Sequence, residues 1–259
     1  MRLALFADIH GHAIALDAVL ADVEAQGGAD AYWVIGDLVA FGPDPVTVLQ
    51  RLSRLPQLHV VRGNTDRYVT TADRPPGASL ETVQADPSLL PGFAEVSQSL
   101  AWTQGAVTAS GWLDWLSELP LERRGTLPDG TRLLAVHASP GRDDGGGVHP
   151  ALEEAALETL LAGCDADLVC VGHTHWPLER RSGSIRAINV GSVGNPLRLD
   201  LRASYVLLEA DTTGCQVHFR RVAYDYGAAM EAVRRVRHPG SRFILNFLQG
   251  NAKPGWEPA

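Results

Sequence analysis

Five short apolar runs in this 259-residue sequence are each followed by side chains that can bind a metal ion. These side chains carry carboxylate, amide or imidazole groups, and they are Asp8 and His10, Asp37, Asn64 and Asp66, His137, and His173 and His175. A lone Asp at a strand end usually caps a turn, and a lone His usually meets a backbone carbonyl, but this clustering favours a metal centre. Because the donors are oxygen and nitrogen only, they favour a first-row divalent ion such as Mn, Fe, Ni, Co or Zn over an all-oxygen calcium site.

The apolar runs are predicted to be strands of an α/β fold, and they span residues 3–7, 31–35, 58–61, 132–136 and 167–171. Short runs that are apolar throughout are typical of strands buried on both faces. Helical spacing of Leu16, Val19 and Val23 predicts a helix after the first run, and Asp44 followed by Pro45 predicts the start of another after the second. The resulting β-α-β-α-β order predicts parallel pairing, in which ligands bind at the carboxyl ends of the strands.

The rest of the chain is predicted to complete a single domain over residues 1–259. Residues 67–130 contain a proline-rich loop and then a helical pattern rich in Trp, and we expect a helical insertion over the sheet edge. It would either cap a site or complete the core as a helix pair. A second, more antiparallel sheet is predicted from three consecutive strands, at residues 184–190, 203–210 and 216–224. Helices are expected over 227–249, followed by a loose tail from residue 250.

Composition narrows the classes of partner. A net charge of -8 disfavours a protein that holds long nucleic acid by its phosphates, although it leaves a small phosphate ester open. Lysine is nearly absent, and the glycine-rich stretches lack the lysine of a P-loop. No stretch approaches the roughly 20 apolar residues that span a bilayer. The cysteines Cys164, Cys170 and Cys215 form no CxxC pair. We therefore expect a soluble cytoplasmic protein with reduced thiols and no membrane partner, and the oligomeric state stays open.

Five ordered blocks resemble those of the calcineurin-like metallophosphoesterases. They are D-x-H at 8–10, GD at 36–37, GNxD at 63–66, the single His137, and GHTH at 172–175, and the resemblance runs over about residues 1–200. The stretches GDLVAFGPDP, HASP and NVGSVGNP look most like the small bacterial phosphodiesterase-like branch. The resemblance implies a four-layer α-β-β-α sandwich with two mixed sheets and a metal site at the carboxyl ends of the strands.

The resemblance also implies a centre of two divalent transition-metal ions, with a hydroxide between them that attacks phosphorus in line. Carried over by position, the ligands of one ion would be Asp8, His10, Asp37 and His175, and those of the other Asp37, Asn64, His137 and His173. Asp37 would bridge the ions, because a carboxylate can bridge two cations whereas an amide or imidazole cannot. Two-metal sites of this kind hold their ions about 3.5–4 Å apart.

Two positions depart from the family pattern. Family members usually carry His where this chain has Thr65, and that His and the following acid, here Asp66, protonate the leaving oxygen. A threonine hydroxyl cannot serve as this acid. The enzyme would then favour leaving groups that need little protonation, recruit His12 as a substitute acid, or mainly bind; His12 as a plain surface residue is the competing interpretation. Phe41 replaces an arginine that protein phosphatases and symmetrical dinucleoside tetraphosphate hydrolases use to hold phosphate. Candidate phosphate contacts, which are alternatively surface residues, are Arg62, Arg67, Arg142 and Arg198.

The sequence therefore predicts a dinuclear metal-dependent phosphoesterase acting on a phosphodiester or a small nucleotide. The predicted catalytic residues are Asp37, Asn64, Asp66 and His12. A phosphomonoesterase or protein phosphatase is one alternative. A regulatory protein that binds metal and nucleotide with weak turnover is the other.

Overall fold

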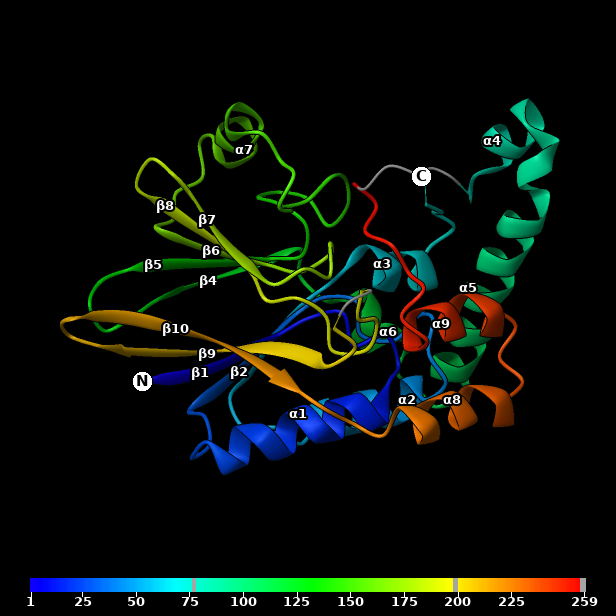
Figure 1. Cartoon of the computed structure of the whole chain (residues 1–259), viewed down its shortest axis with the longest axis horizontal. Coiled ribbons are helices and arrows are strands. Elements are labelled where there is room, and N and C mark those ends of the chain that lie inside the picture. The colour runs from blue at the N-terminus through cyan, green and yellow to red at the C-terminus, as the bar shows by residue number, and fades with distance from the viewer. Residues whose placement is uncertain (76–77, 198–199, 257–259) are drawn as a thin grey trace.

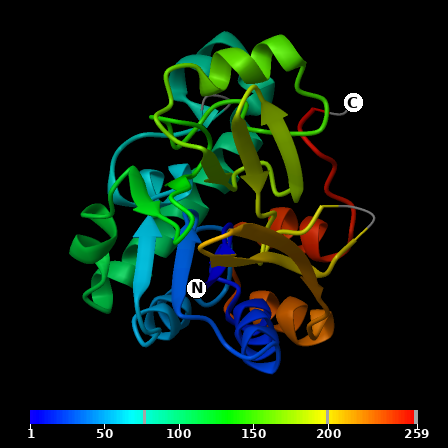
Figure 2. The same ribbon diagram turned by 90° about the vertical axis from the view of Figure 1, so that its left-hand side faces the viewer.

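The computed structural model describes residues 1–75, 78–197 and 200–256, which form two mixed five-stranded sheets packed face to face (Figures 1 and 2). The strand order is β10-β9-β1-β2-β3 in the first sheet and β4-β5-β6-β8-β7 in the second. In the part of the chain that is described, no helix is both long and apolar enough to cross a bilayer.

The first sheet is built on the parallel strands that the sequence predicts. It contains β1 (Arg2–Phe6), β2 (Ala31–Ile35), β3 (Leu58–Val61), β9 (Ala203–Asp211) and β10 (Gly214–Val222). β1 pairs in parallel with β2 and β2 with β3, while β9 lies antiparallel to β1 on its other side. Along β1, Leu3 and Leu5 pack into the core between the sheets, and Ala4 and Phe6 pack against helices. Burial on both faces explains why the run is apolar throughout.

The second sheet holds the fourth and fifth predicted strands. It contains β4 (Glu122–Thr126), β5 (Arg132–Val136), β6 (Leu168–Val171), β7 (Leu178–Ser182) and β8 (Ile185–Asn189). β6 is central, parallel to both β5 and β8, and the edge strands β4 and β7 are antiparallel to their neighbours. β4 and β7 carry several charged side chains, as edge strands that discourage pairing with other chains often do.

Helices cover the outer face of each sheet and give the α-β-β-α order. Those that contribute to the core under the first sheet are α1 (Ala13–Ala25), α2 (Pro45–Leu52), α3 (Asn64–Thr70), α5 (Leu90–Ala109), α6 (Leu113–Ser117), α8 (Tyr226–Arg235) and α9 (Ser241–Leu248). α7 (Glu154–Leu161) covers the second sheet through Leu157 and Leu161. The four-layer sandwich expected from the sequence is confirmed.

Helix α1 is also tied to the first sheet by a polar cluster. Asp22 on α1 accepts hydrogen bonds from Tyr205 on β9 at 2.7 Å and from Arg220 on β10 at 3.0 Å. Burial raises the pKa of Asp22, but the hydrogen bonds from Arg220 and Tyr205 outweigh it and hold that pKa below its usual value. The cluster fixes α1 against β9 and β10, the two strands beside the parallel part of the sheet.

Two predictions about the later part of the chain are wrong. The expected second sheet was to contain residues 184–190, 203–210 and 216–224 together, but only the first of these, β8, lies there. β9 and β10 instead extend the first sheet beside β1, because their apolar side chains complete the core on both of its faces. The tail is not loose over residues 250–256, since Ala252 and Pro254 are buried.

The segment 67–130 has features of both predicted alternatives. α4 (Leu80–Ala85), the short 3-10 helix η2 (Pro87–Leu89) and the start of α5 project beyond the sheets at the right of Figure 1. The later part of α5 packs into the core through Leu100 and Val107, and α6 does so through Leu116. β4 then joins the second sheet. A capping role for the segment stays a prediction.

Candidate metal centre

The predicted ligands lie where the strands of the two sheets end, and their backbone is unusual. Residues with a left-handed backbone that are not glycine include Asp8 (φ 54°), His10 (φ 50°), Asp37 (φ 56°), His173 (φ 68°) and His175 (φ 59°). Such conformations are uncommon outside glycine, and where they cluster they mark functional sites. The surrounding structure must therefore hold this backbone in place.

Hydrogen bonds between the loops supply that restraint. The loop after β1 is joined to the loop after β2 because the backbone N–H groups of Asp8 and His10 donate to the carbonyls of Gly36 and Asp37, each at 3.0 Å. The N–H of His173, in the loop after β6, donates to Asp8 Oδ2 at 2.9 Å. One carboxylate thus links the two sheets and keeps its second oxygen for another partner.

Donor atoms from four loops converge around Asp8 and Asp37. Asp8 Oδ1 lies 3.2 Å from His175 Nε2 and 3.8 Å from both His10 Nε2 and His137 Nε2. Asp37 Oδ2 lies 3.4 Å from His137 Nε2 and 3.7 Å from His10 Nε2. These atoms form two overlapping groups, one with Asp8, His10 and His175 and one with Asp8, Asp37 and His137, each compact enough for one ion.

The imidazoles are oriented as metal ligands. The Nδ1 atoms of His10, His137 and His175 lie 2.7–2.9 Å from the carbonyl oxygens of Ala40, Ile35 and Asn195. Donation from Nδ1 to a carbonyl leaves the lone pair on Nε2, and these three Nε2 atoms all face the carboxylates. A backbone partner of this kind fixes the ring and its tautomer.

Several inward-facing atoms lack a partner that a cation would supply. His10 Nε2 and His175 Nε2 lie 3.3 Å apart, so two lone pairs face each other when both Nδ1 atoms carry the proton. Among the described residues, Asp8 Oδ1 and His137 Nε2 are buried and have no hydrogen-bond partner. Buried polar atoms without partners are rare in proteins. The donor set therefore fits divalent cations.

The electrostatics lead to the same interpretation. Burial lowers the pKa of His137, but the carboxylates of Asp37 and Asp8 outweigh it and raise that pKa to about 10. Burial raises the pKa of Asp37, but the neighbouring His137 and His10 outweigh it and the pKa falls well below its usual range. The buried negative charge thus demands positive charge from its surroundings, which metal ions can supply in place of protons.

Asn64 and His173 form a third part of the site. His173 Nε2 lies 2.8 Å from the carbonyl of Gly145, and His173 Nδ1 lies 3.0 Å from Asn64 Oδ1. Donation from Nε2 to Gly145 leaves the Nδ1 lone pair facing another acceptor oxygen. The rings of His173 and His137 are 5.2 Å apart. All seven predicted ligands are therefore grouped together, and their allocation to two ions stays a prediction.

Asp66 lies beside this group and binds the backbone of two loops. Its Oδ2 accepts from the N–H groups of Asp37 and Gly63, and its Oδ1 accepts from that of Leu38, each at 2.9 Å. The Thr65 N–H donates to Asp37 Oδ1, also at 2.9 Å. Burial and the charge of Asp37 raise the pKa of Asp66 to about 7. The GNTD block thus holds the Asp37 loop through both a side chain and a backbone amide, a role for Thr65 that sequence reasoning missed.

His12 is not a surface residue, so that expectation is wrong. Its side chain is 2% exposed, and Gly194 packs so closely that an added Cβ would lie 2.7 Å from His12 Cδ2. Burial lowers the pKa of His12 to about 3. An imidazole with this pKa is uncharged at neutral pH, which argues against His12 as the substitute acid. The burial of His12 depends on a contact with residue 194, far away in the sequence, so the residues around the helix start do not indicate it.

The candidate phosphate-binding arginines are engaged with aspartates. Asp143 pairs with Arg62 and with Arg67, each at 2.9 Å, and Arg142 pairs with Asp144 at 3.0 Å. The pairing partners lie in the glycine-rich stretch 141–147, whose two aspartates were the available signal. Arg198 lies outside the described residues. The three described arginines are thus largely neutralised by neighbouring carboxylates.

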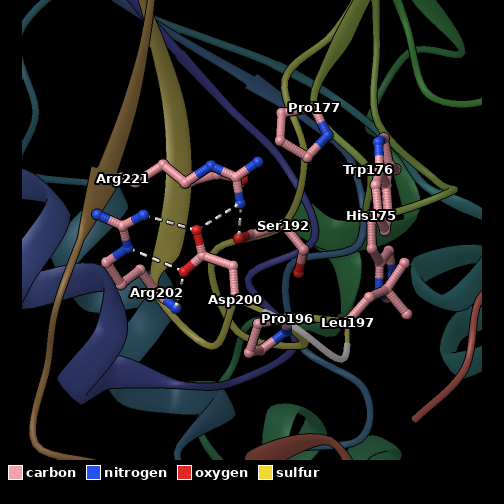
Figure 3. Close-up of a pocket in the computed structure, with 10 residues that line it drawn as sticks. His175, Trp176, Pro177, Ser192, Pro196, Leu197, Asp200, Arg202 and Arg221 are labelled. Atoms are coloured by element: carbon pink, nitrogen blue, oxygen red, sulfur yellow. Dashed lines mark hydrogen bonds and ion pairs between the residues drawn. The ribbon is translucent and has the colours of Figure 1, made fainter. Parts of the chain in front are cut away.

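Two hollows adjoin His175. The larger is a cleft of about 520 Å³ whose lining includes His173, His175 and residues of the chain's C-terminal segment. The smaller, of about 220 Å³, is shown in Figure 3, where Arg202 and Arg221 both point toward Asp200. Arg202 Nη2 and Arg221 Nη1 lie 2.7 and 3.2 Å from Asp200 Oδ2, so two guanidinium groups share one carboxylate in this second hollow. The larger cleft is the one that gives access to two predicted ligands.

Comparisons with known proteins agree with this fold. The sequence matches the family model of the calcineurin-like phosphoesterase superfamily domain over residues 1–213. It is 27% identical to the uncharacterized protein MJ0912 of Methanocaldococcus jannaschii over 94% of this chain and 97% of that protein. It is 34% identical to a symmetrical bis(5'-nucleosyl)-tetraphosphatase of Paracidovorax citrulli over 53% of this chain, and the match spans only 44% of that protein.

Two solved structures resemble the whole fold. A metallophosphoesterase from Sphaerobacter thermophilus has a TM-score of 0.74 and 26% identity, covering 97% of this chain and 100% of that chain. The hypothetical protein PH1004 from Pyrococcus horikoshii OT3 has a TM-score of 0.79 and 20% identity, covering 97% of this chain and 99% of that chain. The second likeness concerns the fold alone.

Proposed function

Because the chain belongs to the calcineurin-like phosphoesterase superfamily, we propose that it uses two divalent transition-metal ions to hydrolyse a phosphodiester or a small nucleotide. The observation that carries the proposal is the convergence of buried donor atoms, with Asp8 Oδ1 and His137 Nε2 left without partners among the described residues. The net charge of -8 supports a small substrate over long nucleic acid.

When bound, the ions supply Lewis acidity and a hydroxide nucleophile for displacement at phosphorus. The chain's own residues hold the geometry. Asp37 lies between the donor groups, with Oδ2 toward His10 and His137 and Oδ1 accepting from the Thr65 N–H. The backbone carbonyls that bind Nδ1 of the histidines fix each ring before substrate arrives. Such preorganisation stabilises charge that develops in the transition state.

Thr65 favours substrates whose leaving group needs little help from an acid. No imidazole stands at this position, and the Thr65 side chain is 5% exposed with a hydroxyl that has no hydrogen-bond partner among the described residues. A phenol or a nucleotide phosphate leaves without a strong proton donor, whereas a simple alkoxide does not. A diester of such a group is therefore our favoured substrate class.

Hydrolysis of bis-p-nitrophenyl phosphate and of p-nitrophenyl phosphate by Mn-loaded protein tests the proposal. We expect faster turnover of the diester, with metal analysis showing two ions per chain. Faster turnover of the monoester would favour a phosphomonoesterase or protein phosphatase. Protein that is metal-loaded and binds nucleotide but hydrolyses neither ester would favour the regulatory alternative.

A further inference from the structure

One wall of the larger cleft beside the predicted ligands comes from the end of the chain. Lys253, Gly255 and Trp256 line the cleft together with His173 and His175. In Figure 1 the red C-terminal segment leaves α9 and runs beside the loops that follow the strands. We call residues 250–256 the C-terminal segment. The cleft has a volume of about 520 Å³, which suits a ligand the size of a mononucleotide.

The C-terminal segment is held in place along its length. The N–H of Gly250 donates to the carbonyl of Phe247 at 2.9 Å, which ends α9. Ala252 and Pro254 are then buried and alternate with the exposed Lys253 and Gly255. This alternation anchors one side of the segment in the protein and leaves Lys253 accessible in the cleft.

Trp256 packs the far end of the segment against loops that connect strands of the second sheet. Its ring stacks on His149 with centroids 4.9 Å apart and an interplanar angle of 13°, and it meets Trp176 edge to face at 6.0 Å. Trp176 directly follows the predicted ligand His175. Phe247 on α9 also lines the cleft, and its ring lies 6.0 Å from the ring of His175. The cleft thus combines aromatic surface with direct access to the predicted metal ligands.

Lys253 is the only lysine in the sequence. None of the described residues makes a hydrogen bond or ion pair with it, whereas Arg62, Arg67 and Arg142 are paired with aspartates. An ammonium group without a partner beside a metal centre is suited to bind a phosphate oxygen as a point charge. In a chain of net charge -8, this cation is placed where an anionic substrate would enter.

We propose that the C-terminal segment is the substrate-recognition wall of this site, with Lys253 binding a phosphate oxygen and Trp256 packing against an aromatic ring of the substrate. The substrate class is then a nucleotide or another phosphate ester that carries an aromatic group, which rests on the proposed phosphoesterase function. Packing of a base on an aromatic side chain contributes about 1–3 kcal/mol, or roughly 5- to 150-fold in affinity.

The single lysine allows a test that does not depend on turnover. An acetylating N-hydroxysuccinimide ester should modify Lys253 and the α-amino group of Met1, which donates to the carbonyl of Ala210 and serves as an internal control. With Mn-loaded protein, AMP and ribose 5-phosphate should slow acetylation of Lys253 at least several-fold and leave Met1 unchanged, as read by mass spectrometry. Equal rates at Lys253 with and without bound AMP would overturn the role of Lys253.

Calorimetry on variants separates the two contacts. Trp256→Leu should remove the preference for AMP over ribose 5-phosphate, whereas Trp256→Phe should retain most of it. Lys253→Met should weaken binding of both ligands about tenfold. High salt should weaken binding to the wild type as well, because it screens the charge of Lys253. Lys253→Arg should retain most of the wild-type affinity. Arg234→Met, an exposed change on α8, is the control.

The outcomes distinguish this inference from the proposed function. If Mn-loaded wild type binds none of these ligands and hydrolyses neither nitrophenyl ester, the proposed function fails and the inference with it. If the wild type binds AMP and hydrolyses the diester, but the Lys253 and Trp256 variants bind like the wild type, only the inference fails.

Discussion

Replacing Asp66 by Asn tests whether this carboxylate holds the loops that carry Asp37 and Asn64. The side chain is 1% exposed and accepts three backbone N–H groups at 2.9 Å, from Asp37, Leu38 and Gly63. Asn keeps one acceptor oxygen and places an NH₂ group where the other oxygen was. At least one backbone N–H then faces a donor in place of an acceptor.

The expected loss follows from these bonds. Because the pKa of Asp66 is raised to about 7, its carboxyl is partly protonated at neutral pH, and the value for an ordinary hydrogen bond, about 0.5–1.5 kcal/mol, applies. A buried donor left without a partner costs about 1–3 kcal/mol more. We expect Asp66→Asn to lower the free energy of unfolding of the metal-free protein by about 1–3 kcal/mol, less than the sum because the contacts are coupled. For a chain of this size the melting temperature should fall by about 2–12 °C.

Urea unfolding of the metal-free protein and Mn titration by calorimetry are the assays. Because Asp66 orients the ligand loops, its loss should weaken Mn binding about 10- to 100-fold, while the pH profile of hydrolysis at saturating Mn keeps its shape. Asp211→Asn removes an exposed carboxylate that accepts from the Thr213 N–H and should change neither property appreciably. An effect on stability below about 0.5 kcal/mol, the usual size of a surface substitution, together with unchanged Mn affinity, would refute the reasoning.

Three further predictions concern other parts of the molecule. Asp37→Asn should abolish hydrolysis of bis-p-nitrophenyl phosphate if Asp37 bridges the ions; a wild-type rate would exclude that role. Gly63→Ala should lose metal binding in calorimetry because a Cβ there overlaps Asp37 Oδ1 and the Asp37 nitrogen, whereas Gly105→Ala on α5 has open space and should fold and bind Mn normally. Asp22→Asn should destabilise the protein equally at pH 7 and pH 5 in urea unfolding. Because the folded-state pKa of Asp22 is lowered, its contribution is present above the unfolded pKa of about 3.9 and should be lost as the pH falls below it. A loss of that contribution on raising the pH would contradict the sign.

The parallel core and its strand ends could be predicted because burial on both faces leaves a local signal. LALFA and AYWVI are apolar at every position, and the polar residues directly after them mark the ends of the strands. β4 and β7 were missed for the opposite reason, since ERRGT and LERRS are edge strands whose charged side chains resemble a loop. Placing β9 and β10 required knowing which sheet they border, and pairing with residues some 200 positions away leaves no local pattern.

The same distinction applies to the site. Candidate ligand types could be proposed from the sequence because carboxylate, amide and imidazole groups bind metal ions wherever the backbone runs. Their surroundings could not, because they depend on contacts between distant segments. Asp143 neutralises Arg62 across 81 positions, and Trp256 reaches His149 from the end of the chain. Burial of His12 under Gly194 is of the same kind.

The GNTD block shows why a change at position 65 can leave a metal site intact. The contacts that hold Asp37 come from the Thr65 N–H and from the Asp66 carboxylate, and neither depends on the side chain at position 65. A histidine there would add a proton donor without being needed for the geometry. In the proposed function, the threonine would alter which leaving group is expelled, while Asp37 keeps the position that a bridging carboxylate would need. On this proposal, selection among substrates would depend on groups outside the block, such as Lys253 and Trp256, which line the adjoining cleft.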